Sequence, residues 1–186
     1  FVAVSGTMSN SADVAAWLDA PRECHFHFTD EDRPVKLTTH VVAIPSHSRN
    51  PFQFAKLLTC KMVPVLREYS AGKPALIFCP SRRETSATAA HVAQEAQHEL
   101  TTIAAQQLDI PPTALKASLL EAATRCADAT LKQTIPFGVA FHHAGLAGGD
   151  RQLVERLFHD QVLRVVCCTS TLALGVNLPA RLVVIK

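Results

Sequence analysis

The sequence predicts an α/β fold built on an open parallel sheet with helices on both faces. Short apolar runs alternate with amphipathic stretches in the second half of the chain, and this alternation requires parallel strands joined by crossover helices. The run PALIFCP is continuously apolar, which is typical of a strand covered on both faces. A chain of 186 residues with 48% hydrophobic residues can also bury one good core.

The first part of the chain predicts a strand, a polar loop and a helix. Residues 1–4 form an apolar run, SGTMSNS is a polar turn, and residues 12–18 have helical spacing after a cap at Asn10 or Ser11. Charge and proline at residues 31–34 indicate a domain boundary near residue 30. We therefore expect one domain to end with residues 1–30 and a second to occupy residues 31–186.

The second predicted domain contains the sheet. VKLTTHVVAI has a strand-like pattern, and Asn50-Pro51 starts a helix that runs to about residue 69. The alanine-rich stretch of residues 84–135 predicts a helical insertion of two or three helices, broken at Pro111-Pro112. Further strands are expected in FGVAF, VLRVVCC and LVVIK, with an amphipathic helix over residues 150–159.

Composition excludes some classes of protein and leaves others open. The apolar runs are far shorter than the roughly 20 residues of a membrane helix, and no signal pattern opens the chain. The formal charge of +2 neither supports nor excludes nucleic-acid binding, which would need a local cluster of groups. The six cysteines contain no CxxC pair, so we interpret them as reduced core thiols, against disulfides or a zinc site. Both ends of the chain look cut through secondary structure, which predicts a fragment.

Polar residues follow the predicted strands at their carboxyl ends, where open parallel sheets bind ligands. These residues are Ser5-Gly6-Thr7, Ser81-Arg82, His142-His143 and Thr169-Ser170-Thr171.

The segment TSTLALGVNLPA is the most informative of these ends. Its hydroxyls and free backbone amides can hold a phosphate without sequence preference, and Gly175 allows close backbone approach. An ordinary capped turn would use the same residues, and the residues alone leave both interpretations open. The same holds for Arg82, which can bind phosphate or cap a helix, and for the histidines, one of which can be structural. His142 and His143 are adjacent and lack partners at metal-ligand spacing, so no metal site is expected.

Five blocks of the sequence resemble the DExH (Ski-like) branch of superfamily-two helicases, in family order. FVAVSGTMSN is similar to the coupling motif (motif III), HFTDEDRPVKL to the linker into the second motor domain, and KPALIFCPSRRET to motif IV. FGVAFHHAGLAGGDRQLVERLF is similar to the HHAG segment, and TSTLALGVNLPA to motif V. Within the branch, FVAVS, RPVKL and TSTLALGVNLPARLVVIK look closest to the meiotic crossover (Mer/HFM-type) DNA helicases.

The resemblance implies a fold and a role for each matching position. The fold is a RecA-like helicase C-terminal motor domain, preceded by the last strand and helix of the first motor domain. Ser5 and Thr7 match the interdomain coupling motif, although Gly6 and Ser9 depart from the usual alanine and proline, which puts the stiffness of that turn in doubt. The remaining assignments are nucleic-acid binding by Ser81, Arg82, His142, His143, Thr169 and Thr171, and nucleotide binding by Gly175 and Asn177.

The resemblance also implies ATP and Mg²⁺, held mainly by a first motor domain that this sequence lacks. No GxxxxGK[ST] motif and no DExH box occur, and the arginine-finger motif would begin after Lys186. We therefore expect no catalytic residue in this chain and no ATP hydrolysis by it alone.

The implied function of the whole protein is an ATP-dependent DNA helicase. It would couple ATP hydrolysis to 3′–5′ translocation and duplex unwinding, in meiotic recombination and in the nucleus. The expected partners are ATP and single-stranded or branched DNA, with RNA less favoured and no membrane. The alternatives are an RNA helicase of the same branch and a catalytically degenerate cassette that acts as a scaffold.

Overall fold

The computed structural model describes residues 2–6, 8–45, 50–170, 172 and 178–186. The chain forms two compact units, residues 1–44 and residues 45–186. Each unit is described by itself. The division falls after residue 44, and the predicted domain boundary near residue 30 stays a prediction.

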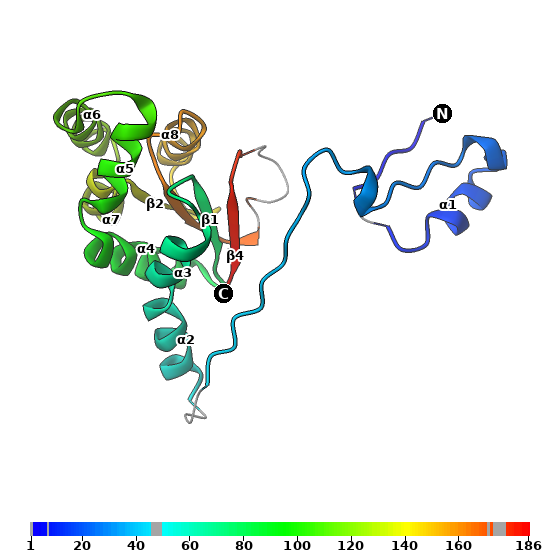
Figure 1. Cartoon of the computed structure of the whole chain (residues 1–186), viewed down its shortest axis with the longest axis horizontal. Helices are drawn as coiled ribbons and strands as arrows, with labels where there is room; N and C mark the ends of the chain where they lie inside the picture. The colour runs from blue at the N-terminus through cyan, green and yellow to red at the C-terminus, as the bar shows by residue number, and fades with distance from the viewer. Residues whose placement is uncertain (1, 7, 46–49, 171, 173–177) are drawn as a thin grey trace. The chain divides into compact units, whose positions relative to one another are not determined.

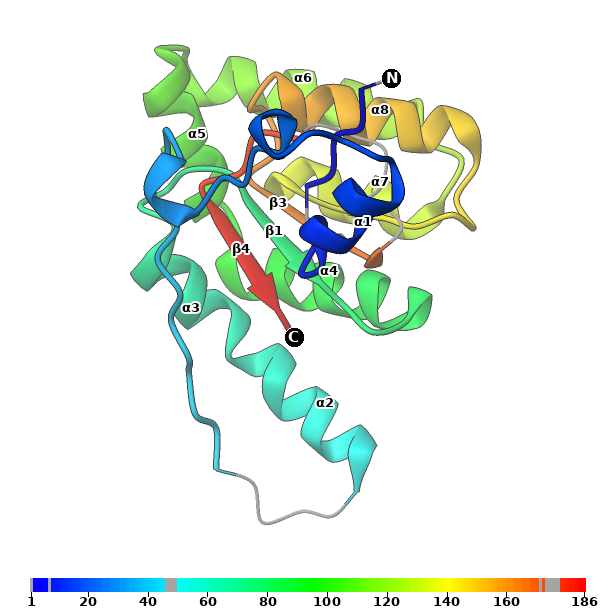
Figure 2. The ribbon, with the colours of Figure 1, turned by 90° about the vertical axis from the view of Figure 1, so that its right-hand side faces the viewer.

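The unit of residues 45–186 contains a parallel sheet of four strands, β1 (Ala75–Phe78), β2 (Val139–His142), β3 (Val165–Cys168) and β4 (Leu182–Ile185). The strand order is β2-β3-β1-β4 (Figure 1). α4 (Arg82–Ala96) packs on β2 and β3, while α8 (Gly148–His159) packs on β2 from the other face (Figures 1 and 2). The predicted α/β fold with a parallel sheet is confirmed.

The helices of this unit largely follow the sequence pattern. The insertion predicted between residues 84 and 135 was expected to contain two or three helices, but it forms four, α4 to α7. Its buried small residues, such as Ala89 and Ala104, let neighbouring elements approach closely. The helices are α2 (Pro51–Cys60), α3 (Met62–Tyr69), α4 (Arg82–Ala96), α5 (Glu99–Leu108), α6 (Pro112–Thr124), α7 (Ala129–Thr134) and α8 (Gly148–His159), with a 3₁₀ turn, η3, at Ile135–Phe137.

The helix predicted from residue 50 to residue 69 is broken into α2 and α3. Pro64 has no N–H to donate to the carbonyl of Cys60, and its ring would collide with that carbonyl in a continuous helix. The chain therefore ends α2 at Cys60 and starts α3 at Met62.

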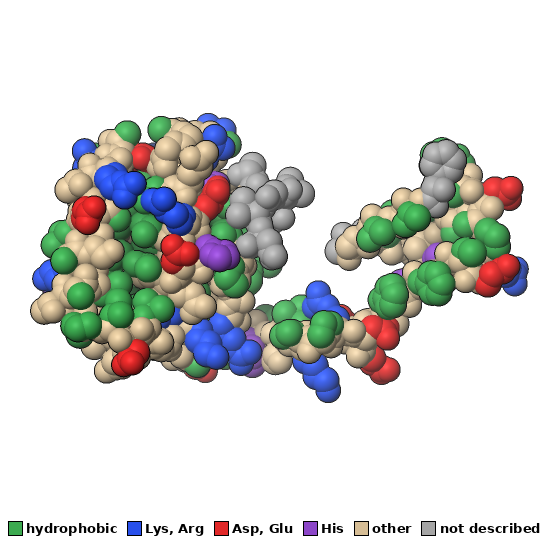
Figure 3. Space-filling view, turned by 90° about the horizontal axis from the view of Figure 1, so that it is seen from above, with side chains coloured by type: hydrophobic (Ala, Val, Ile, Leu, Met, Phe, Trp, Pro, Cys, Tyr) green, Lys and Arg blue, Asp and Glu red, His purple; other side chains and the backbone are tan. Residues whose placement is uncertain are grey.

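The unit of residues 1–44 contains α1 (Ser11–Trp17) and two 3₁₀ turns, η1 (Arg22–Cys24) and η2 (Asp30–Asp32). The predicted strands at residues 1–4 and 35–44 are wrong for the described residues, which form no strand. None of the described residues of this unit is buried. Hydrophobic side chains lie on its surface instead (Figure 3), and Val2 and Val4 are each 93% exposed.

The structure also tests the prediction that the six cysteines are reduced core thiols and bears on the expectation that the chain has no membrane helix. All six cysteines are free. Cys24 and Cys60 are exposed, so the prediction of core thiols is wrong for these two, whereas Cys79, Cys126, Cys167 and Cys168 are buried. No helix in the described part of the chain is long and apolar enough to cross a membrane.

Candidate nucleic-acid interface

The carboxyl ends of the strands lie level at one edge of the sheet. Phe78 pairs with both Cys168 and Ile185, and His142 also pairs with Cys168. The Thr169 N–H donates to the His142 carbonyl over 3.3 Å, and the Cys79 N–H donates to the Cys168 carbonyl over 2.8 Å. The register thus brings the predicted residues after β1, β2 and β3 to the same edge.

Ser81 caps the helix that follows β1. Its Oγ accepts a hydrogen bond from the Glu84 N–H over 3.2 Å, and its backbone is extended, as an N-cap residue requires. The exposed hydroxyl still has its own hydrogen to donate. Because the N-terminus of a helix carries a partial positive charge, Ser81 and the first amides of α4 favour an anion at this point.

Arg82, His143 and Gly145 come together at the same edge. A Cβ on Gly145 would lie 3.2 Å from Arg82 Nη1 and 3.2 Å from His143 Nδ1, so any larger residue would displace both side chains by a few tenths of an ångström. The Gly145 N–H donates to His143 Nδ1 over 3.1 Å, which leaves Nε2 of that ring as the donor. The His143 ring also stacks on Phe141, at 5.6 Å between ring centroids.

The electrostatics of this cluster favour an anion. Burial and, next, the Arg82 charge lower the pKa of His143 from its ordinary value of 6.5, so the ring is neutral at pH 7. Arg82 therefore brings a charged donor and His143 a neutral Nε2–H donor to the surroundings of Gly145, and both kinds of donor bind phosphate oxygens.

His142 points into the protein. Its side chain is 7% exposed, and its Nε2 lies 2.8 Å from Glu155 Oε1 of α8. This ring ties β2 to α8, which is the structural role that the sequence left open for one of the two histidines. Glu155 was not predicted from the sequence, because the contact depends on how α8 packs against β2.

The remaining predicted residues are only partly placed. Thr169 is half-buried at the end of β3, and its carbonyl accepts a hydrogen bond from the Leu172 N–H. Ser5 is exposed in the other unit. The predicted residues Thr7, Thr171, Gly175 and Asn177 lie outside the described residues.

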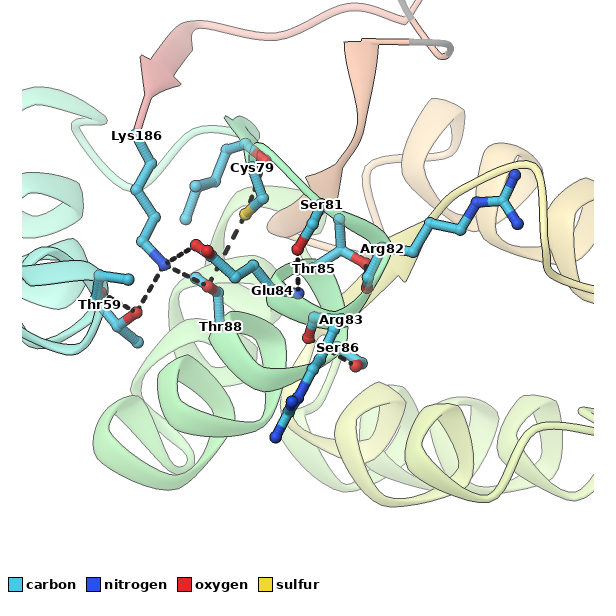
Figure 4. Close-up of polar contacts among 12 residues, drawn as sticks. Thr59, Cys79, Ser81, Arg82, Arg83, Glu84, Thr85, Ser86, Thr88 and Lys186 are labelled. Atoms are coloured by element: carbon cyan, nitrogen blue, oxygen red, sulfur yellow. Dashed lines mark hydrogen bonds and ion pairs between the residues drawn. The ribbon is translucent and has the colours of Figure 1, made fainter. Parts of the chain in front are cut away.

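Lys186, directly after β4, is the centre of a polar network that was not predicted from the sequence (Figure 4). Its ammonium group contacts Thr59 Oγ1 at 2.7 Å, Glu84 Oε2 at 2.9 Å and Thr88 Oγ1 at 3.2 Å, and its side chain is 2% exposed. The one available signal was a lysine directly after the apolar run LVVI. The network joins the end of β4 to α2 and to the start of α4.

The thiol of Cys79 lies beside this network. The pKa of Cys79 is lowered to about 7, mainly by a hydrogen bond from Cys167. Burial raises this pKa, whereas the hydrogen bond with Thr88 and the charge of Lys186 lower it further. Because Cys79 is only 5% exposed, this thiol is shielded from reagents in solution. No group of three potential metal ligands occurs among the residues that the structure describes.

Comparison with known proteins shows that the whole chain is similar to part of several helicases. It is 40% identical over 190 residues to the mouse "Probable ATP-dependent DNA helicase HFM1" and 40% identical over 185 residues to the Arabidopsis thaliana "ATP-dependent DNA helicase homolog MER3". The Arabidopsis "DExH-box ATP-dependent RNA helicase DExH14" is 36% identical over 193 residues. Each match covers all of this chain.

Over its whole length the chain is similar to DNA and RNA helicases, which is consistent with the resemblance to the Ski-like DExH helicases of superfamily two. It spans 12%, 16% and 8% of the lengths of these three relatives, respectively. No family model matches the chain. The family agrees with the observed parallel sheet, and it gives the carboxyl edge a context in which binding of a nucleic-acid strand can be proposed.

Proposed function

We propose that this chain forms the strand-binding part of the second motor domain of an ATP-dependent DNA helicase. The observation that supports the proposal best is the cluster at the carboxyl edge, where Arg82 and His143 both lie against Gly145 and Ser81 caps α4 next to Arg82. Hydroxyl, guanidinium and imidazole groups can donate hydrogen bonds to phosphate oxygens, and such contacts do not depend on which base the nucleotide carries. A motor that moves along a strand requires such sequence-independent contacts.

The nucleotide side of the proposal rests on the resemblance alone. Gly175 and Asn177 match the positions that face ATP from the second motor domain, and they lie outside the described residues. ATP hydrolysis, with Mg²⁺, would take place against a first motor domain, and closing and reopening of the cleft would advance the strand in the 3′–5′ direction. Residues 1–30 would end the first domain, with Ser5 and Thr7 in the coupling motif. A role in meiotic recombination in the nucleus follows from the similarity to the MER3 and HFM1 helicases.

The decisive experiment measures strand binding by the whole protein. Arg82→Ala should weaken binding of single-stranded DNA by on the order of tenfold, because a charge-assisted contact to phosphate is lost. It should also reduce the slope of log affinity against log salt by about 0.7, the value for one phosphate contact on a single strand. Arg156→Ala is the matched control, since Arg156 is an exposed arginine in the last turn of α8. Equal binding by the two variants would overturn the proposal.

A second variant tests the nucleotide side. Asn177→Ala in the whole protein should reduce ATP turnover more than it reduces strand binding. Equal loss of the two activities would remove the assignment of Asn177 to nucleotide.

An RNA helicase is the second candidate function, and the match to the DExH14 RNA helicase supports it. Phosphate-holding donors do not distinguish the two sugars unless a group reads the 2′-OH. Displacement of matched DNA and RNA duplexes with a 3′ or a 5′ overhang separates the candidates. We expect displacement of the DNA duplex with the 3′ overhang, and preference for RNA would favour the alternative. A degenerate cassette would bind strands but displace neither duplex.

A further inference from the structure

A groove with a volume of about 380 Å³ lies between α2 and the start of α4. It begins beside Ser81, the residue that caps α4 at the proposed strand-binding edge. The groove is lined by Phe52, Ala55, Lys56, Thr59, Ser81, Arg83, Glu84, Ala87, His91 and Lys186.

Two helix faces form the walls of the groove. Phe52 and Lys56 are four residues apart on α2, and Arg83, Ala87 and His91 follow the same spacing on α4, so each set lies along one side of its helix. Arg82 and Arg83 leave the start of α4 in different directions (Figure 4). The Arg82 side chain thus lies near Gly145 at the carboxyl edge, whereas the Arg83 side chain lines the groove.

The groove carries a net positive charge. Lys56 and Arg83 are exposed, and neither forms an ion pair with any residue that the structure describes. Glu84, the acid in the lining, is neutralised by the Lys186 ammonium at 2.9 Å. Two cations are therefore left to attract an anion.

An exposed aromatic ring stands beside these cations. Phe52 is 82% exposed although its side chain is fully apolar. An exposed aromatic side chain in a positively charged groove is the combination that binds single-stranded nucleic acid, with a base stacked on the ring and phosphates near the cations. A groove for an acidic peptide would use the same cations but would gain no comparable stacking from Phe52.

We propose that the groove between α2 and α4 binds a single-stranded nucleic acid, as an extension of the strand that the carboxyl edge grips. A base stacks on Phe52, and Lys56 and Arg83 contact the phosphates on either side of it. The strand reaches the groove by passing over Ser81 at the start of α4. This inference rests on the proposed function, because it concerns the same strand beyond the edge.

The experiment compares variants of the whole protein on fluorescent single strands of increasing length. Phe52→Ala should weaken binding of long strands by about 5- to 150-fold, the range for loss of one stacked base, and should leave the shortest bound strands unaffected. Lys56→Ala and Arg83→Ala should each reduce the salt slope on long strands by about 0.7. Lys73→Ala, an exposed lysine just before β1, is the matched control. A strand containing a photoreactive pyrimidine should crosslink within α2, and Phe52→Ala should abolish that crosslink.

The outcomes separate this inference from the proposed function. If Arg82→Ala weakens binding of every length while Phe52→Ala, Lys56→Ala and Arg83→Ala match the Lys73→Ala control, the groove does not bind the strand and the edge still does. If Arg82→Ala also matches its control, the proposed function fails. Unchanged thermal unfolding of Phe52→Ala is expected from its exposure, so a loss of affinity reports the strand contact.

Discussion

His142 and His143 are neighbours in the sequence, and the strand directs their rings to opposite sides. His142 is buried against Glu155, and His143 faces the proposed strand-binding edge beside Arg82. Alternation along a strand predicts that two adjacent side chains part in this way. Which of them faces the core depends on the register of β2 against β3 and on the packing of α8, so the sequence left that choice open.

The lowered pKa of His143 predicts opposite effects of acid on strand binding and on stability. A bound phosphate favours the protonated ring, so strand affinity should increase as the pH falls below about 6.5. In the free protein the folded state holds the proton less tightly than the unfolded state does. Its stability should therefore decrease as the pH falls from 6.5 towards the lowered pKa. Fluorescence anisotropy of a labelled strand and chemical denaturation, each from pH 7.5 to about 5.5, measure the two effects.

His143→Gln should remove the acid-dependent gain in affinity and retain a donor at the site. His159→Gln is the control, because His159 is an exposed histidine at the C-terminal end of α8. A pH profile that is the same for His143→Gln and for the unmodified protein would contradict the placement of this ring beside phosphate.

Gly145→Ala should lower strand affinity without lowering stability. The added methyl would lie 3.2 Å from Arg82 Nη1 and from His143 Nδ1, so both side chains must move by a few tenths of an ångström. Weakening one charge-assisted contact costs about 1 kcal/mol, or roughly fivefold in affinity. Stability should stay constant or rise slightly, because alanine restricts the unfolded chain. Gly148→Ala, where the methyl meets nothing within 4 Å, is the control in binding and denaturation assays.

At the scale of elements, the sequence predicts what depends on local patterning and misses what depends on distant partners. β1 and α8 follow apolar runs and helical spacing close to their predicted bounds. The apolar run at residues 1–4 has an equally good strand pattern, but its described residues 2–4 pair with no strand in the described part of the chain, and pairing is a property of the whole fold. Lys186 was missed for the same reason, since Thr59, Glu84 and Thr88 lie about 100 residues earlier in the chain.

The contact between Lys186 and Glu84 should stabilise the junction of β4, α2 and α4. Lys186→Met should lower the free energy of unfolding by about 2–4 kcal/mol, because Glu84 keeps its charge without a partner. This range lies below that for a fully buried pair, since Glu84 is 29% exposed. Adding Glu84→Gln should recover most of the loss, because the unpaired charge is then removed.

Urea denaturation of the single and double variants completes a double-mutant cycle for this pair. A coupling energy near zero would show that the contact contributes nothing to stability. Arg67→Ala provides the comparison, because the Arg67–Glu99 ion pair between α3 and α5 is more exposed and should contribute less than about 1 kcal/mol.

At the scale of the whole molecule, the two units differ in how much apolar surface they bury. The unit of residues 45–186 contains the whole described core, including Ile77 and Phe158. The unit of residues 1–44 leaves Phe26 and Phe28 more than 70% exposed. A segment of that size without a buried core has little to offset its conformational entropy. The relatives are about six to twelve times longer than this chain, and in them the matching segment has further chain available to pack against.

Trp17 makes this difference measurable, because it is the single tryptophan of the chain and lies in the unit without a core. It is 83% exposed, so the chain by itself should show the emission of an indole in water and full quenching by acrylamide. Circular dichroism should report a cooperative transition from the unit of residues 45–186, and Trp17 emission should not change through it. In the whole protein, Trp17 should be less accessible to acrylamide if residues 1–44 pack against another domain. A Trp17 transition that coincides with the loss of helix in the chain alone would mean that the two units unfold together.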